Sequence, residues 1–402
     1  MGSMFEKIEP KVVSYSSPVK TVRPIGIDAG NGEVKVVGYA PVNGSKWVEF
    51  QLKMRSLVKP GKLIQHIQCE TECDLIEVLA EKKTYVIGST DMPLPTSSWK
   101  YQSGEARAAL VYAAAAKAIT THFKDVGGKE SVLSLAVSMM ASYYWSLESD
   151  GMGSQALTRS QEKVQKLQTA MASTFYLTGD NWPLIRYHQL PVTVIGETMA
   201  AILSLLLNDK GELTGIHNPG DEILIVDGGF GDTAVLHVVI GDNGLPKIKH
   251  RFVESIGVDK NVISVLDAGV DDYKRKHHGA VNSDMRHMTK GSELLYRQSV
   301  KLFGKELPLL PFKEEGVNSM SVQLAAAVDK YCGTAGEISA IYLVGGFPEL
   351  AWSVFGDDYF QTEESGFKDF YNVIIPKEPS FANARGLLRA NLFLKGNGNV
   401  TK

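Results

Sequence analysis

The chain has 402 residues, of which 44% are hydrophobic and 22% are charged, so it is long enough for two or three domains with buried cores. Its net charge of −3 gives no general electrostatic attraction to nucleic acid or to an anionic membrane. No apolar run of the sequence reaches the roughly 20 residues of a membrane span. Three cysteines do not suggest a disulfide framework and are typical of a reducing compartment, so we expect a cytoplasmic protein.

The first part of the chain predicts an arm followed by strands and one long helix. Residues 1–23 carry acids and no apolar segment typical of a signal peptide, and the residues before Met4 resemble the remnant of an expression tag. We interpret 1–23 as a partly ordered arm. The elements expected next are strands at 25–28, 34–40, 46–53 and 84–88, a loop at 91–102, an alanine-rich helix at 104–123 and a buried strand at 131–139.

The later part predicts further helices and a second set of strands. The elements expected first are a helix at 159–171, a strand within 187–196, a buried helix from 197 and two strands around a glycine turn at 222–240. Helices are expected next at 260–270 and 292–303, around a charged segment at 271–291, and at 318–332. A buried strand at 338–350 that ends in a glycine turn and a closing helix at 380–395 complete the set. The sequence therefore predicts an α/β protein.

One pattern occurs twice. A strand, an Asp-x-Gly turn and a second strand are found at Asp28 and again at Asp227, and each copy continues into helices and further strands. We infer two similar α/β domains with a cleft between them. The expected boundaries are a first domain at 24–187 with a small subdomain inserted at about 41–102, a second domain at 188–380, and a C-terminal helix and tail at 381–402 that return to the first domain.

The residue types at these turns suit a nucleotide. Glycine lets backbone N–H groups approach an anion closely, so the two turns can hold phosphate. Asp28 and Asp227 can bind a hydrated Mg²⁺ ion, which prefers carboxylates, waters and substrate phosphates. Lys35 on the returning strand can reach the phosphates as a point charge. Gly345 and Gly346, at the end of another strand, leave room for a flat base.

The order of these motifs resembles that of the actin, sugar kinase and heat-shock-chaperone ATPase superfamily. GIDAGNGEVK is similar to its first phosphate motif, IVDGGFGDTAVL to its second and IYLVGGFPEL to its adenosine motif. VIGETMAAILSL and NARGLLRANLFL resemble its two connecting helices. Within the superfamily, D-A-G-N-G-x-x-K is most similar to the bacterial and archaeal actin-like proteins of the ParM group. The resemblance implies an actin-like fold with two ribonuclease H-like α/β domains that flank a nucleotide cleft.

The resemblance also implies roles for single residues. It implies an ATPase in which Glu197 orients the attacking water and Asp227 takes part in catalysis, with Asp28 and Asp227 as metal ligands. Actin has a serine where this chain has Asn31, so the amides from Gly30 to Glu33 are expected to hold more of the phosphate. The nucleotide-binding residues implied are Asp28, Gly30, Asn31, Gly32, Lys35, Gly228, Gly229, Asp232, Thr233, Gly345, Gly346 and Phe347.

The implied function is a filament-forming ATPase that uses ATP or GTP with Mg²⁺ and assembles head to tail, for plasmid or other DNA segregation. Contact with DNA is expected through an adaptor protein rather than directly, because the chain is mildly acidic. Two alternatives stay open, a small-molecule kinase of the same superfamily and an actin-like scaffold that forms no filament. A zinc site at His66, Cys69 and Cys73 is disfavoured, because no fourth ligand is spaced to match.

Overall fold

The chain forms two compact units, and each is continuous except where the C-terminal segment joins the first. Unit 1 comprises Met1–Ile216 and Phe381–Lys402, and unit 2 comprises His217–Ser380. The computed structural model describes residues 22–42, 46–61, 75–80, 83–88, 104–123, 130–149, 155–178, 182, 184–187, 191–278, 294–335, 338–370 and 372–398. The expected arm up to residue 21, the expected loop at 91–102 and the cluster of His66, Cys69 and Cys73 lie outside the described residues.

Unit 1 is built on a mixed six-stranded sheet. Its strands are β1 (Val22–Ala29), β2 (Glu33–Val42), β3 (Lys46–Arg55), β7 (Glu130–Met139), β11 (Leu184–Tyr187) and β12 (Thr193–Gly196). They follow the order β11-β7-β1-β2-β3, and β12 also pairs with β7. β1 pairs antiparallel with β2 and parallel with β7. The expected first-domain boundary after residue 187 differs from this unit, which keeps residues 191–216 because β12 is parallel to β7.

A second, four-stranded sheet of unit 1 packs against the helix α2 (Glu105–His122). It has the order β10 (Tyr176–Leu177), β5 (Ile76–Leu79), β6 (Thr84–Ile87) and β4 (Val58–Pro60). Three of these strands fall in the insertion expected at about 41–102, but β10 comes from a later part of the chain. Unit 1 also contains the hairpin β8 (Trp145–Ser149) and β9 (Gln155–Arg159) and the helices α2 (Glu105–His122), α3 (Ala141–Tyr144), α4 (Gln161–Met171), α5 (Glu197–Leu206) and α10 (Ala382–Gly398).

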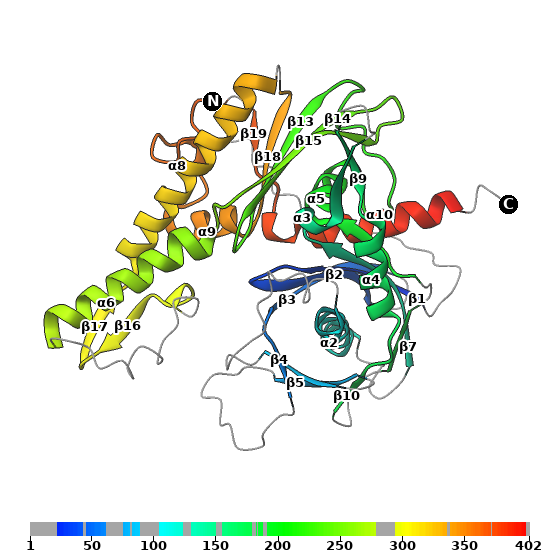
Figure 1. Ribbon diagram of the computed structural model, residues 1–402, viewed down its shortest axis with the longest axis horizontal. Coiled ribbons are helices and arrows are strands. Elements are labelled where there is room, and N and C mark those ends of the chain that lie inside the picture. Colours follow the sequence, from blue (N-terminus) through cyan, green and yellow to red (C-terminus); the bar gives the residue numbers. More distant parts are fainter. Residues whose placement is uncertain are drawn as a thin grey trace. The chain divides into compact units, whose positions relative to one another are not determined.

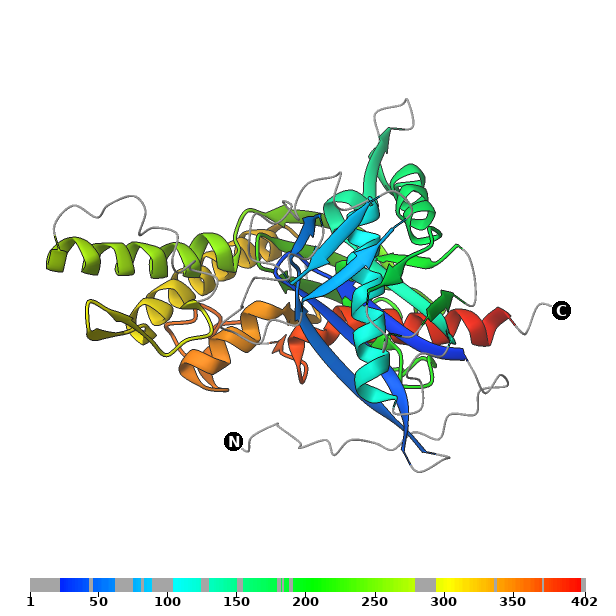
Figure 2. The same cartoon turned by 90° about the horizontal axis from the view of Figure 1, so that it is seen from below.

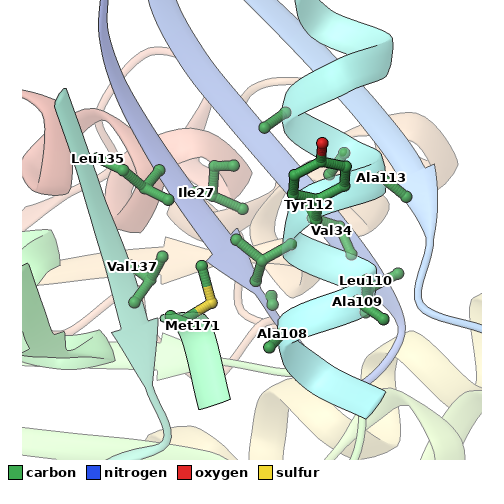
Figure 3. Packing of buried hydrophobic residues seen from close by; sticks show 14 of the residues in the cluster. Ile27, Val34, Ala108, Ala109, Leu110, Tyr112, Ala113, Leu135, Val137 and Met171 are labelled. Atoms are coloured by element: carbon green, nitrogen blue, oxygen red, sulfur yellow. The ribbon is translucent and has the colours of Figure 1, made fainter. Parts of the chain in front are cut away.

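The helix α2 forms the centre of unit 1. It packs against strands of both sheets, and Figure 1 shows it end-on between them. Thirteen of its residues are buried, most of them alanines, which let the helix approach the sheet closely. Figure 3 shows Ala108, Ala109 and Ala113 of α2 with Ile27 and Val137 of the sheet. All five are 0 or 1% exposed, so this layer excludes water from one face of β1 and β7.

The opposite face of the same sheet is covered by α10 and α5, and Figure 2 shows α10, in red, on the other side of the blue strands from α2, in cyan. Two glycines make this approach close. A Cβ on Gly26 of β1 would lie 2.2 Å from the Ala384 carbonyl oxygen of α10, and a Cβ on Gly386 would lie 1.6 Å from the Ala200 carbonyl oxygen of α5. The backbones therefore touch at both crossings, and no larger residue fits without a shift of the helix.

Unit 2 is built on a five-stranded sheet. Its order is β15 (Pro246–Glu254), β14 (Thr233–Ile240), β13 (Glu222–Gly228), β18 (Ala340–Gly345) and β19 (Val373–Ile374). One face is covered by η1 (Asp259–Ile263), which is a turn of π-helix, and by α6 (Ser264–His278), α8 (Leu310–Ala335) and α9 (Gly346–Phe355). Two short 3₁₀ turns, Tyr359–Gln361 and Pro379–Phe381, follow α9. Figure 1 shows the helices α6 and α8 side by side.

The two main sheets share one topology. In each, the strand that carries the Asp-x-Gly turn pairs antiparallel with the next strand, which pairs antiparallel with a third. On its other side the same strand pairs parallel with a later strand, β7 in unit 1 and β18 in unit 2. The expected duplication is therefore present in the fold as well as in the sequence pattern.

Several expected elements differ from the structure. The helix expected at 292–303 is wrong, because β16 (Ser299–Leu302) and β17 (Lys305–Pro308) form a hairpin there. Its two-residue turn, Phe303 and Gly304, has positive φ at both positions, as the tight turns of hairpins require. The buried strand expected to run to 350 ends at Gly345, where α9 begins at once. Helix α6 extends into the expected segment 271–291, α8 begins before 318, and β15 was not expected.

A buried histidine links the sheet of unit 2 to α8. His237 of β14 is 1% exposed, and its Nε2 lies 2.8 Å from an oxygen of Glu222 while its Nδ1 lies 2.8 Å from the Tyr331 hydroxyl. Burial lowers the pKa of His237, and the nearby Glu222 carboxylate opposes this shift in part. Lys249 also binds Glu222, and its ammonium together with the His250 side chain lowers the pKa of His237 further.

We predict that Gly386→Ala destabilises unit 1. Alanine favours a helix over glycine, so local propensity alone predicts a gain in stability. The added Cβ would meet the Ala200 carbonyl oxygen at 1.6 Å, and overpacking of this kind costs about 1–3 kcal/mol or more. Urea unfolding followed by circular dichroism measures the change. Leu394→Ala is the control, since this leucine of the same helix is exposed; a Gly386→Ala variant as stable as this control would contradict the close crossing.

We predict a pH effect at His237. Below about pH 6.5 an unfolded chain binds a proton on this histidine, whereas the folded chain, with its lowered pKa, takes up the proton only at lower pH. As the pH is lowered, the free energy of unfolding should therefore decrease more steeply in the native chain than in His237→Gln. His277→Gln, a change at an exposed position of α6, should keep the native slope. Equal slopes in the native chain and His237→Gln would contradict this account.

Candidate functional site

The first glycine turn joins β1 to β2. Asp28 stands directly opposite Lys35 in the ladder, and residues opposed in this way share one face of an antiparallel pair. The carboxylate and the ammonium are therefore on the same face of the hairpin. Gly30, Asn31 and Gly32 form the turn between them and are partly exposed, so their amides lie at the surface of unit 1 as the phosphate interpretation requires.

Asp28 carries a buried oxygen that needs a partner. Its side chain is 3% exposed, and within the described part of the chain Oδ1 makes no hydrogen bond. Native proteins rarely leave such an atom unsatisfied, since the desolvated carboxylate is costly. A cation or a water molecule held by a cation would satisfy it. This atom is the best support within unit 1 for a metal at the first turn.

Three strand ends meet at one edge of the unit 1 sheet. β1 and β12 both run parallel to β7, with Ile27 opposite Val137 and Gly196 opposite Met139. The carboxyl ends of parallel strands lie together, and this edge is where α/β proteins commonly bind ligands. The turn after β1 and the start of α5 at Glu197 therefore lie at the same edge. Sequence analysis predicted both pieces, and the parallel register brings them together.

Two residues that sequence analysis did not single out connect these pieces. Arg107 in the first turn of α2 is 0% exposed, and its Nη2 donates to the Ser138 carbonyl oxygen at 2.9 Å. Nη2 also lies 3.3 Å from Ser138 Oγ and 3.9 Å from Glu197 Oε1. Ser138 Oγ in turn accepts a hydrogen bond from the Ala29 N–H at 3.1 Å. One sequence signal could have indicated Arg107. It is a cation between alanines in the first turn of a helix, where the helix dipole disfavours a positive charge.

The second glycine turn joins β13 to β14. Asp227 is 8% exposed and stands at the end of β13, beside Gly228. The Gly229 N–H donates to the Asp232 carbonyl oxygen at 3.0 Å, which closes the turn. The Gly229 carbonyl in turn accepts from the N–H of Val258, just before η1. The turn is thus held by backbone bonds on both sides.

The third glycine motif lies next to the second turn. Gly345 at the end of β18 pairs in parallel register with Gly228. Its φ of 89° is in a region that only glycine adopts readily, and a Cβ there would lie 2.4 Å from Asp227 Oδ1. Gly346 has open space around it and is the first residue of α9. The motif therefore combines a strand end with a helix N-terminus, where amide groups point outward.

The remaining predicted residues of unit 2 have defined surroundings. Thr233 is buried, and its hydroxyl donates to the Ile256 carbonyl oxygen at 2.8 Å. Burial raises the pKa of Asp232, and the nearby Lys260 ammonium opposes this. Phe347 is 1% exposed and belongs to the core, where it packs beneath Gly228. Phe347 thus supports the turn from below.

The carboxylates of Asp28 and Asp227 are better suited to Mg²⁺ than to a metal ion whose ligands all come from the protein. Among the described residues there is no group of three or more His, Cys, Asp or Glu side chains that could hold a metal ion. Mg²⁺ instead binds through one or two carboxylates and keeps waters or substrate phosphates as its other ligands. A single buried carboxylate at the end of a strand, as at Asp28 and at Asp227, suits this kind of binding.

Comparison with known proteins identifies the fold. No protein-family model and no curated protein matches the chain. Among solved structures, a ParM from a 15-stranded filament of Clostridium botulinum is 14% identical with a TM-score of 0.60, covering 92% of this chain and 99% of that one. An archaeal actin homolog is 17% identical with a TM-score of 0.59, covering 92% and 98%. The apo psk41 ParM protein is 15% identical with a TM-score of 0.58, covering 94% and 100%.

The chain therefore has an actin-like fold of the ParM type, as the sequence motifs predicted. The archaeal actin homolog has also been solved in complex with ADP, and that structure is 16% identical with a TM-score of 0.55, covering 92% of this chain and 98% of that one. None of the described helices combines the length and the hydropathy needed to cross a bilayer.

We predict that two adjacent glycines respond differently to alanine. Gly345→Ala forces a side chain into a glycine-only conformation and against Asp227 Oδ1, so it should lower the free energy of unfolding of unit 2 by about 1–3 kcal/mol. Gly346→Ala, with no atom within 4 Å of the added Cβ, should change it by less than about 0.5 kcal/mol. Urea unfolding measures both. Equal effects of the two changes would contradict the geometry of this strand end.

Proposed function

We propose that this chain is an actin-like ATPase that binds ATP with Mg²⁺ through its Asp-Gly turns and assembles into filaments. The observation that carries the proposal is the shared topology of the two sheets. Each sheet places one buried aspartate at the end of its central strand and a glycine turn directly after it. A carboxylate and a phosphate-binding turn in each unit are groups that a triphosphate with its metal requires.

Each residue has a separate role in this proposal. Asp28 and Asp227 would hold Mg²⁺ or its waters, and the ion would neutralise charge on the phosphates. The turn amides of Gly30, Asn31, Gly32, Gly228 and Gly229 hold the phosphate oxygens, with Lys35 as a point charge. Gly345 and Gly346 leave a flat surface for the base of ATP or GTP. Asp232 and Thr233 complete the phosphate side in unit 2, where the Thr233 hydroxyl would have to leave Ile256 to contact phosphate directly.

Glu197 is the residue that we assign to the attacking water. It begins α5 at the same sheet edge as the first turn, and its side chain is 17% exposed although its Oε1 is buried. A carboxylate in this position can orient a water molecule and accept its proton. With one such group, hydrolysis should be slow relative to assembly.

Filament formation is supported by the fold and by the neighbour described as a ParM filament. Head-to-tail contacts between identical chains are heterologous, and they produce open filaments when the rotation does not close. A role in plasmid or other DNA segregation would require a DNA-binding adaptor, because the net charge of −3 does not favour direct binding to DNA. We place this activity in the cytoplasm.

We predict that ATP with Mg²⁺ drives the native chain into filaments and that Glu197→Gln prolongs them. The variant keeps the size of the side chain but loses its charge, so nucleotide should still bind while hydrolysis slows by about 100-fold or more. Right-angle light scattering and electron microscopy with ATP, with ADP and without nucleotide measure assembly, and phosphate release measures hydrolysis.

Asp227→Asn serves as the contrasting variant, since it should weaken Mg²⁺-dependent nucleotide binding itself. Absence of polymer in every condition, together with ADP release on addition of a sugar, would favour a small-molecule kinase. Nucleotide binding without polymer or turnover would favour an actin-like scaffold. Unchanged hydrolysis in Glu197→Gln would contradict the assigned role of that residue.

A further inference from the structure

Arg107 is a fully buried cation next to the candidate site. It is the largest of the fully buried side chains in the described part of the chain, and Ala106, Ala108 and Ala109 surround it in α2. Burial of an unpaired charge is costly, and the first turn of a helix adds an unfavourable dipole. An apolar residue here would make a simpler core. The fold therefore keeps a guanidinium at a position where packing alone disfavours it.

The contacts of Arg107 all lie at one edge of the sheet. Nη2 binds both the carbonyl oxygen and the hydroxyl of Ser138, at 2.9 and 3.3 Å. The same nitrogen is 3.9 Å from Glu197 Oε1. Ser138 Oγ accepts the Ala29 N–H, next to Asp28 in the first turn. One guanidinium thus connects the end of β7 with the first phosphate turn on one side and with Glu197 on the other.

Part of the hydrogen-bonding capacity of this guanidinium is unused. Within the described residues, Nε and Nη1 of Arg107 are buried and make no hydrogen bond. If Arg107 served only to hold strand ends together, its contacts with Ser138 would require donors but no positive charge. The positive charge gains its effect at Glu197, because a cation close to a carboxylate favours the ionised form and restricts its orientation.

We propose that Arg107 is a positioning residue for Glu197 and, through Ser138, couples the first phosphate turn to it. The guanidinium holds the Glu197 carboxylate so that it is directed toward the sheet edge, where the water attacks. A shift of the first turn on phosphate binding is passed by the Ala29 N–H to Ser138 and so to Arg107. This inference rests on the proposed ATPase function and adds a residue through which that site is controlled.

Arg107→Gln tests the proposal in the full-length chain. It keeps donors for Ser138 and removes the charge. We expect single-turnover ATP hydrolysis to slow by about 100-fold, as for a misplaced catalytic group, while the affinity for ADP is unchanged. Without the cation the protonated Glu197 carboxyl group is favoured, so the acidic limb of the pH–rate profile should move to higher pH. Arg107→Lys keeps the charge and should keep the native limb at a reduced rate.

Two further variants separate positioning from structure. In a Glu197→Gln background, Arg107→Gln should cause no additional loss of rate, because the group that it positions is already disabled. Arg389→Gln is the matched control: this arginine of unit 1 binds Asp209 and the Ser204 carbonyl oxygen on the α10–α5 side. It should lower stability without moving the pH–rate profile. Circular dichroism checks that each variant folds, and Arg107→Lys decides the question if Arg107→Gln does not fold.

The outcomes are distinct. Suppose that the native chain hydrolyses ATP and that Arg107→Gln lowers the rate without shifting the acidic limb of the pH–rate profile. If this loss also adds to the effect of Glu197→Gln, the positioning role alone is overturned. The positioning role is also overturned if the acidic limb of the pH–rate profile of Arg107→Lys differs from that of the native chain. A native chain that hydrolyses no nucleotide would overturn the proposed function and, with it, the role of Arg107.

Discussion

The parallel pairing of one central strand in each unit sets the position of everything else in the candidate site. β1 pairs with β7 in unit 1, and β13 pairs with β18 in unit 2. Strands that run in the same direction end at the same edge, so groups from distant parts of the chain meet there without any direct bond between them. In unit 1 this edge gathers Asp28, Ser138 and Glu197. In unit 2 it brings Asp227 against Gly345, so closely that only a glycine fits.

Much of this arrangement can be predicted from sequence because it is encoded locally. The two hairpins are visible as apolar runs around glycine turns, and their repetition at Asp28 and Asp227 predicted the topology that the two sheets share. The roles of the individual site residues stay predictions. Where local patterns are ambiguous, the prediction was wrong. The run at 292–303 has apolar spacing compatible with a helix, but the turn conformation of Phe303 and Gly304 makes it a hairpin instead.

The part that could not be predicted depends on contacts between residues far apart in the chain. Arg107 lies in an alanine-rich helix whose pattern indicates packing and nothing else. Its role depends on contacts with the Ser138 carbonyl oxygen and with Glu197, which are far from it in the sequence. The register of the parallel strands brings these residues next to it. The end of β18 is similar, since the change from strand to helix at Gly345 is set by its contact with Asp227. No local propensity encodes either contact.

The helix α10 has a consequence for how the protein is made. It is the last described element, yet its backbone rests directly on β1, the first described strand. A ribosome completes all of unit 2 before it delivers this helix, so the part of β1, β2 and β7 that α10 covers stays exposed until then, although α5 has already been made. Unit 2, whose residues are continuous in sequence, has no such delay and can fold as soon as it emerges. The nascent first unit is then the part that has an apolar sheet face to protect from water and from other chains until α10 has been made.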